Sequence, residues 1–249
     1  MRKRLEIVAL MAGLLMFTGC YGDYSKSDGM VYYHSMHTLM PVPYKFVVQD
    51  ADAGTFTDLG DKVGKDKNHV YLAGYILPGA DAATFVNLGH GYASDINGFY
   101  HITESGLDAV AGAQRESFET LSDEYARDGN AVYHKHERLA HVADPGSFEI
   151  VSRHRNHDWC RDKYNYYYDT IRVDVDRASF KILKRGYSKD ANGVYYTVYN
   201  KGLFTVKGAD PRTFRVITRK ISAEGVGRDC SGYFLGTGKI TRGQFDDIH

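Results

Sequence analysis

Residues 61–71 read DKVGKDKNHVY, and this stretch places a polar turn, Asp66-Lys67-Asn68, between two segments of β-forming residues. Asp and Asn side chains accept hydrogen bonds from nearby backbone amides and favour tight turns. Val63 on one side and Val70-Tyr71 on the other favour extended backbone. The stretch therefore predicts a β-hairpin that bends at Asp66-Lys67-Asn68.

This hairpin phrase recurs along the chain with a period of about 31 residues. Each repeat contains a phenylalanine in the motif Thr/Ser-Phe, and successive phenylalanines lie 29, 33, 30, 32 and 34 residues apart: Phe56, Phe85, Phe118, Phe148, Phe180 and Phe214. An aspartate follows each phenylalanine, and an aromatic residue follows that aspartate by five: Asp66, Asp95, Asp128, Asp162, Asp190 and Asp229. The Asp-x-x-Thr/Ser-Phe motif itself predicts a short helical turn capped by its first residue. Because a catalytic group is normally needed only once, residues that recur in every unit are expected to build the scaffold.

The pattern predicts an all-β domain, residues 24–249, built from about seven tandem β-hairpin repeats. Residues 24–33 match a hairpin without its first half, and residues 244–248 match that missing first half. Complementary ends favour a closed, propeller-like ring sealed by terminal strands. A repeat of about 31 residues is, however, short for a four-stranded propeller blade. An open β-array or solenoid therefore remains an equal alternative.

Three motifs resemble the DKNYY repeat family of bacterial proteins: DKNHVY at 66–71, DKYNYY at 162–167 and GADPRTF at 208–214. The resemblance covers essentially residues 24–249. Members of that family are often lipoproteins, and the family implies no established activity. The resemblance consequently supports the architecture, transfers no catalytic residue and implies no cofactor.

The first twenty residues, MRKRLEIVALMAGLLMFTGC, have the composition of a targeting segment. The apolar run from Ile7 to Phe17 is too short to span a bilayer, so residues 1–19 are predicted to be a signal peptide. The ending Phe-Thr-Gly-Cys resembles a bacterial lipobox, which implies lipid attachment at Cys20, with residues 20–23 as a short tether. The next residue is Tyr21 and not Asp, which resembles the class sorted to the outer membrane, facing the periplasm.

Charge restricts the partners of the mature chain. Without residues 1–19 the chain has 28 basic residues (31 − 3) and 30 acidic residues (31 − 1). Nucleic-acid binding requires clustered Lys and Arg, so a nucleic-acid partner is not expected. The expected partners are the membrane, through the lipid, and a protein or a glycan.

One segment, RHRNHDWCRDK from Arg153 to Lys163, departs from the repeat through a four-residue insertion. Its His154, His157 and Cys160 form a candidate set of zinc or copper ligands. In an oxidising envelope Cys160 is also a candidate for a disulfide with Cys230. These cysteines lie in hairpins two units apart, so the insertion would have to reach across to bring them together.

Trp159 and the triplet Tyr166-Tyr167-Tyr168 are the candidate binding aromatics, although strand alternation is expected to bury one or two of the triplet. The sequence has no Gly-rich phosphate loop, Gly-x-Ser-x-Gly or His-Glu-x-x-His. The leading hypothesis is therefore a non-catalytic binding or scaffolding module. The alternatives are an envelope hydrolase, with its site in the segment 153–163 or in a ring channel, and a metal-handling lipoprotein.

Overall fold

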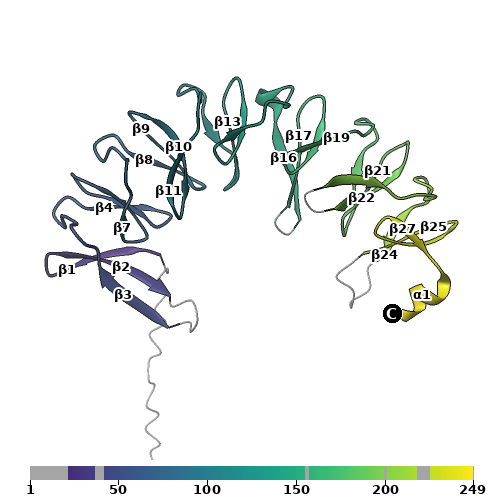
Figure 1. Cartoon of the computed structure of the whole chain (residues 1–249), viewed down its shortest axis with the longest axis horizontal. Coiled ribbons are helices and arrows are strands. Elements are labelled where there is room, and N and C mark those ends of the chain that lie inside the picture. Colours follow the sequence, from purple (N-terminus) through teal and green to yellow (C-terminus); the bar gives the residue numbers. More distant parts are fainter. Residues whose placement is uncertain (1–21, 37–41, 155–156, 199–200, 218–224, 249) are drawn as a thin grey trace, which may run out of the picture. The chain divides into compact units, whose positions relative to one another are not determined.

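The computed structural model describes residues 22–36, 42–154, 157–198, 201–217 and 225–248. Within these ranges the chain forms seven small antiparallel sheets that follow one another in chain order (Figure 1). We name them sheets A to G from the amino terminus. The predicted all-β tandem-repeat fold is confirmed.

Sheets A to C form the first part of the chain, and within each sheet the strands pair in sequence order. Sheet A contains β1 (Tyr24–Ser27), β2 (Met30–Met36) and β3 (Pro43–Val47). Sheet B contains β4 (Thr57–Gly60), β5 (Val63–Lys65), β6 (Val70–Leu72) and β7 (Tyr75–Ile76). Sheet C contains β8 (Val86–Gly89), β9 (Tyr92–Asp95), β10 (Gly98–Thr103) and β11 (Gly106–Ala109).

Sheets D to G repeat the four-stranded arrangement. Sheet D contains β12 (Glu119–Thr120), β13 (Tyr125–Arg127), β14 (Val132–His134) and β15 (Glu137–Arg138). Sheet E contains β16 (Glu149–His154), β17 (His157–Arg161), β18 (Tyr166–Tyr168) and β19 (Ile171–Val173). Sheet F contains β20 (Lys181–Ile182), β21 (Tyr187–Lys189), β22 (Val194–Val198) and β23 (Gly202–Thr205). Sheet G contains β24 (Arg215–Ile217), β25 (Val226–Asp229), β26 (Gly232–Leu235) and β27 (Gly238–Ile240).

The repeating unit is thus a four-stranded meander rather than a hairpin, except in the three-stranded sheet A. The predicted hairpin is its central pair, for example β5–β6 around Asp66. About 31 residues suffice for four strands because several outer strands are very short, with two residues each in β7, β12, β15 and β20.

The carboxyl-terminal segment differs from the prediction. Residues Arg242–Asp247 form helix α1, not the strand expected at 244–248. Thr241 starts the helix through a capping box with Gln244, in which each side chain bonds the other residue's backbone. Phe245 stacks on Tyr233 of sheet G, with 4.0 Å between ring centroids. Helix α1 therefore covers part of its own sheet and supplies no strand for pairing. A short 3-10 helix, η1 (Pro145–Ser147), precedes sheet E.

Apolar cores lie between successive sheets. One core joins sheets A and B, through Val31, Tyr33, Phe56 and Tyr71. Others join C to D, D to E, E to F and F to G. A sheet within this series, such as E, is therefore covered on both faces.

The chain divides into two compact units, residues 1–87 and 88–249, with the boundary inside β8. Sheets A and B belong to the first unit and sheets D to G to the second. In the described ranges, no helix has the length and apolar character needed to cross a membrane.

Candidate functional site

The repeated aspartate lies in the turn between the second and third strands of each sheet from B to G. One carboxylate oxygen accepts hydrogen bonds from the backbone amides two and three residues later, at 2.6–3.2 Å. In five sheets, the tyrosine five residues later donates its hydroxyl to the same carboxylate. We call this arrangement the Asp clasp, and the end of the sheet that carries it the Asp-turn end.

Two further contacts tie the clasp to the preceding segment. The carboxylate of Asp128 also accepts a hydrogen bond from the backbone amide of Gln114, at 2.8 Å, and Asp66 does so from Asp52. In five sheets the hydroxyl of the Ser or Thr before the repeated Phe accepts a bond from the turn backbone, as Ser117 does from Gly129. The predicted helical turn at Asp-x-x-Thr/Ser-Phe is present, since the Phe56 amide donates to the Asp52 carbonyl.

The clasp carboxyls are buried, for example Asp128 at 2% exposure. Burial alone would raise the pKa of Asp128, but the hydrogen bonds from Gln114, Asn130 and Tyr133 bring the pKa below its ordinary value. The same balance lowers the pKa of Asp66, Asp162 and Asp229. Conversely, burial and the neighbouring carboxylate raise the pKa of Tyr133 to about 12. The clasp is a satisfied buried network and presents no reactive group.

These geometries explain the recurring sequence motif, and a model of the DKNYY family matches residues 14–105 and 102–238. The chain belongs to the DKNYY family. No curated protein and no solved structure matches it. In this DKNYY protein, the family's aspartate and its tyrosine are structural residues of the turn.

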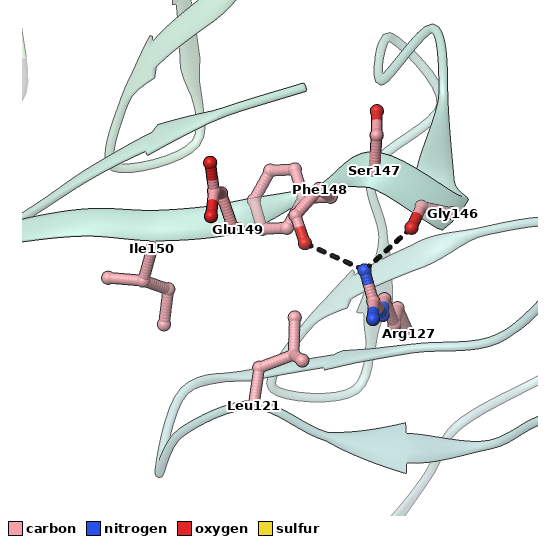
Figure 2. A pocket seen from close by; sticks show the side chains of 7 residues that line it. All are labelled: Leu121, Arg127, Gly146, Ser147, Phe148, Glu149 and Ile150. Carbon is pink, nitrogen blue, oxygen red and sulfur yellow. Dashed lines mark hydrogen bonds between the residues drawn. The ribbon is translucent and has the colours of Figure 1, made fainter. Parts of the chain in front are cut away.

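Hollows between successive sheets are the candidate binding regions. The hollow between sheets D and E, of 410 Å³, lies at the Asp-turn end (Figure 2). Its cation, Arg127, donates to the carbonyls of Gly146 and Phe148 at 2.9 Å each and pairs with Glu119. Lys189 makes the equivalent bond to the Phe214 carbonyl at 3.0 Å. The basic residue before the clasp thus joins neighbouring sheets, which gives this hollow a structural role.

The hollow between sheets E and F lies at the other end of the sheets and is the strongest candidate site. It also measures 410 Å³, and it lies at the end opposite the Asp turns. We call it the E–F groove. Its lining combines aromatic rings, hydroxyls and cations: Ser152, Arg153, Trp159, Tyr168, Ile182, Leu183, Lys184, Arg185, Gly186, Tyr187 and Thr197.

Local sequence sets the walls of the groove. The β16–β17 pair contains the predicted insertion and has a register shift between Ile150 and Ser152. The β20–β21 turn has left-handed backbone at Arg185 (φ 59°) and Gly186 (φ 80°), which suits a tight hairpin turn. Lys184, at the start of this turn, is exposed. Arg153 bonds Asp158 at 2.9 Å, and this contact raises the pKa of the guanidinium.

The candidate aromatics are buried and do not form an exposed stacking platform. Exposure is 3% for Trp159, 8% for Tyr166, 0% for Tyr167 and 5% for Tyr168. Strand alternation directs Tyr167 to the core with sheet D and its two neighbours to the core with sheet F. Because both faces of sheet E are covered, the whole triplet is buried. Trp159 and Tyr168 nevertheless form the floor of the E–F groove.

Two members of the candidate metal set, His157 and Cys160, do not come together. Cys160 belongs to the core with sheet D, whereas the His157 ring packs on Tyr168 at 5.6 Å, on the other face of β17. His157 Nδ1 lies 2.9 Å from Asp169 Oδ2. The side chain of His154 lies outside what the structure describes. Among the described side chains, no group of three or more His, Cys, Asp or Glu residues is arranged to hold a metal.

The predicted Cys160–Cys230 disulfide is absent, because both cysteines are free. Cys160 lies two residues before the clasp aspartate, under the repeated Phe, and burial raises the pKa of its thiol. Other repeats place a small residue there: Gly64, Ala93, Ala126, Ser188 and Gly227. A Cβ at Gly64 would overlap the ring of Phe56, so small size is what this position requires. Cys230 instead lies at the exposed tip of the β25–β26 turn.

The segment 153–163 offers little to a hydrolase. Asp158 is 4% exposed and pairs with Arg153, and Asp162 is 1% exposed and belongs to a clasp. Neither carboxylate can reach a substrate to act as an acid or base. Cys20 lies outside the described residues.

Proposed function

We propose that this DKNYY protein is a lipid-anchored, non-catalytic binding module of the bacterial envelope, and that the E–F groove is its ligand site. One observation carries the proposal: the residues repeated in every unit are used for turns and cores, whereas the groove adds Trp159 and Lys184, which have no counterpart of the same type in the other units. Family membership is consistent with this proposal and adds no activity to it.

The chemistry of the groove favours an anionic ligand. Lys184 and Arg185 lie on one wall and Arg153 on the other, above an apolar floor of Trp159 and Tyr168. Guanidinium and ammonium groups bind carboxylates through charge-assisted hydrogen bonds. A carboxylated glycan strand is therefore the preferred ligand, and an acidic segment of a protein partner is the alternative.

Calorimetric titration with oligogalacturonate, a neutral oligosaccharide and an acidic peptide tests the groove. We expect Lys184→Glu to weaken binding of the acidic ligand by about tenfold, because it reverses a charge on the wall. Lys181→Glu is the matched control: Lys181 is exposed on the same sheet and does not line the groove. Equal losses in both variants, or no binding of either acidic ligand by the native protein, would contradict the proposed site.

The anchoring proposal has its own test. Acylation at Cys20 is expected to hold the protein at the outer membrane, facing the periplasm, because several acyl chains on one residue anchor stably. Cys20→Ser should move the protein from the membrane pellet to the soluble fraction. If the variant still sediments with membranes, the anchoring proposal fails.

A further inference from the structure

The first unit carries an exposed aromatic surface on two sheet edges. Strand β3 is the edge of sheet A, and β7 is the edge of sheet B. Tyr44 on β3 is 47% exposed and Tyr75 on β7 is 70% exposed. Phe46 lies between them, with ring centroids 6.2 Å from Tyr44 and 5.5 Å from Tyr75. We call Tyr44, Phe46 and Tyr75 the aromatic edge.

The ring positions are fixed by packing below the surface. Phe46 also contacts Tyr33, a core residue, at 5.8 Å between ring centroids. A Cβ at Gly74 would lie 2.7 Å from the Phe46 ring, so only glycine allows this close approach. Tyr24 ties the two sheets together, because its hydroxyl accepts from the Gly74 amide and donates to the Lys62 carbonyl, each at 3.0 Å. The aromatic edge is therefore a preformed surface.

The aromatic edge lies close to the proposed lipid attachment. Gly22 donates its amide to the His34 carbonyl at 3.0 Å, and a Cβ at Gly22 would lie 3.6 Å from the Tyr33 hydroxyl. Tyr33 in turn contacts Phe46 of the edge. Only one residue separates Gly22 from Cys20 in the sequence, so a lipid on Cys20 would be joined to this end of sheet A by a short stretch of chain. A lipid on Cys20 would thus bring this part of sheet A to the bilayer surface.

We infer that the aromatic edge rests in the interfacial region of the membrane. Tyrosine suits that region, since its ring is apolar and its hydroxyl can remain hydrated. Exposed Val42, immediately before β3, adds apolar area. The inference rests on the proposed acylation of Cys20 and extends it. Acyl chains provide attachment, and the aromatic edge fixes which face of the first unit contacts the lipid.

Fluorescence quenching by brominated lipids tests this contact. The acylated full-length protein is reconstituted into phosphatidylcholine vesicles with bromine near the headgroup end of the acyl chains. Tyr75→Trp and Tyr44→Trp each place a reporter on the aromatic edge, and signals are compared with the native protein, whose single tryptophan is buried Trp159. We expect brominated lipid to remove most of the added fluorescence in both variants.

Asn68→Trp is the matched control. Asn68 is exposed in the same sheet as Tyr75, but it lies in the turn at the other end of β6. Its added fluorescence should persist in brominated vesicles. If the reporters at positions 44 and 75 are quenched no more than the reporter at 68 in vesicle-bound protein, the inference is wrong, and a glycan or protein becomes the expected partner of this surface.

Cys20→Ser separates this inference from the anchoring proposal. Loss of vesicle binding in this variant, with quenching at 44 and 75 in the acylated protein, supports both. If the variant remains bound, acylation is not the anchor, and quenching at 44 and 75 still decides whether the aromatic edge contacts lipid.

Discussion

The two ends of each sheet differ in a consistent way. At the Asp-turn end, the turn aspartate of each sheet from B to G accepts bonds from the backbone amides two and three residues later, at similar distances. At the opposite end, the turn between the first two strands changes from sheet to sheet: His90-Gly91 in sheet C, Asp123-Glu124 in D and Arg185-Gly186 in F. The comparison teaches that the repeated end holds the fold and that the variable end is where individual sheets can acquire binding properties.

The largest expected change in stability is in sheet D, which allows a direct comparison because it has an aspartate at each end. Asp128→Ala removes the acceptor for three backbone amides and the Tyr133 hydroxyl, which leaves buried donors unsatisfied. We expect a loss of about 3 kcal/mol in the free energy of unfolding. Urea denaturation followed by circular dichroism measures it.

Asp123→Ala is the control at the opposite end. The Asp123 side chain is 77% exposed and pairs only with half-exposed His90 among its described contacts. An exposed ion pair contributes at most about 1 kcal/mol, so this variant should unfold close to the native midpoint. Similar losses in both variants would mean that the two ends do not differ in structural importance.

The second test uses pH, because the clasp depends on ionised carboxyls. The pKa of Asp128 in the folded protein lies below its ordinary value, since its hydrogen bonds outweigh the effect of burial. The clasp therefore contributes its full stability above the unfolded pKa of about 4, and loses it as the pH falls through the lower folded-state pKa.

Asp128→Asn isolates this contribution, because the amide does not titrate. We expect the variant to be less stable than the native protein at neutral pH, and the difference to narrow as the pH falls below about 4. Urea midpoints measured across the acidic range provide the check. A difference that stays constant down to acid unfolding would show that ionisation of Asp128 has no role.

The sequence predicts the Asp-turn end well, because its signals are local. The Asp turn and the aromatic residue five positions later recur in six units, and the turn chemistry follows from residue type alone. The sequence also allows the role of Cys160 as the small residue packed under the repeated Phe to be predicted, since Cys160 occupies the position of Gly64 and Ala93 in other repeats. The spacing of His157 and Cys160 is misleading, because residues three apart on one strand face opposite ways.

Other features depend on contacts that no single segment encodes. Two-residue strands such as β15 are too short to show a period of alternation. The burial of Tyr166, Tyr167 and Tyr168 depends on neighbouring sheets covering both faces of sheet E. Helix α1 is an exception: its capping signal, Thr241-x-x-Gln244, is present in the sequence, but the similarity around Phe245 to the repeat favoured a strand.

The smallest expected effect concerns the tyrosine hydroxyl, which sheet G lacks. Asp229 has Phe234 five residues later and receives bonds from the amides of Asp210, Ser231 and Gly232. The three amides therefore suffice to hold an Asp turn.

Tyr133→Phe makes sheet D resemble sheet G, and we expect a loss of about 1 kcal/mol in the free energy of unfolding, well below that of Asp128→Ala. Phe234→Tyr is the reciprocal change and should be neutral or stabilising, since five other sheets accommodate the hydroxyl beside the carboxylate. Urea midpoints of the two variants measure both effects. If Tyr133→Phe costs as much as Asp128→Ala, the hydroxyl and not the carboxylate–amide network is the main contributor, and the tolerance of Phe234 in sheet G would need another cause.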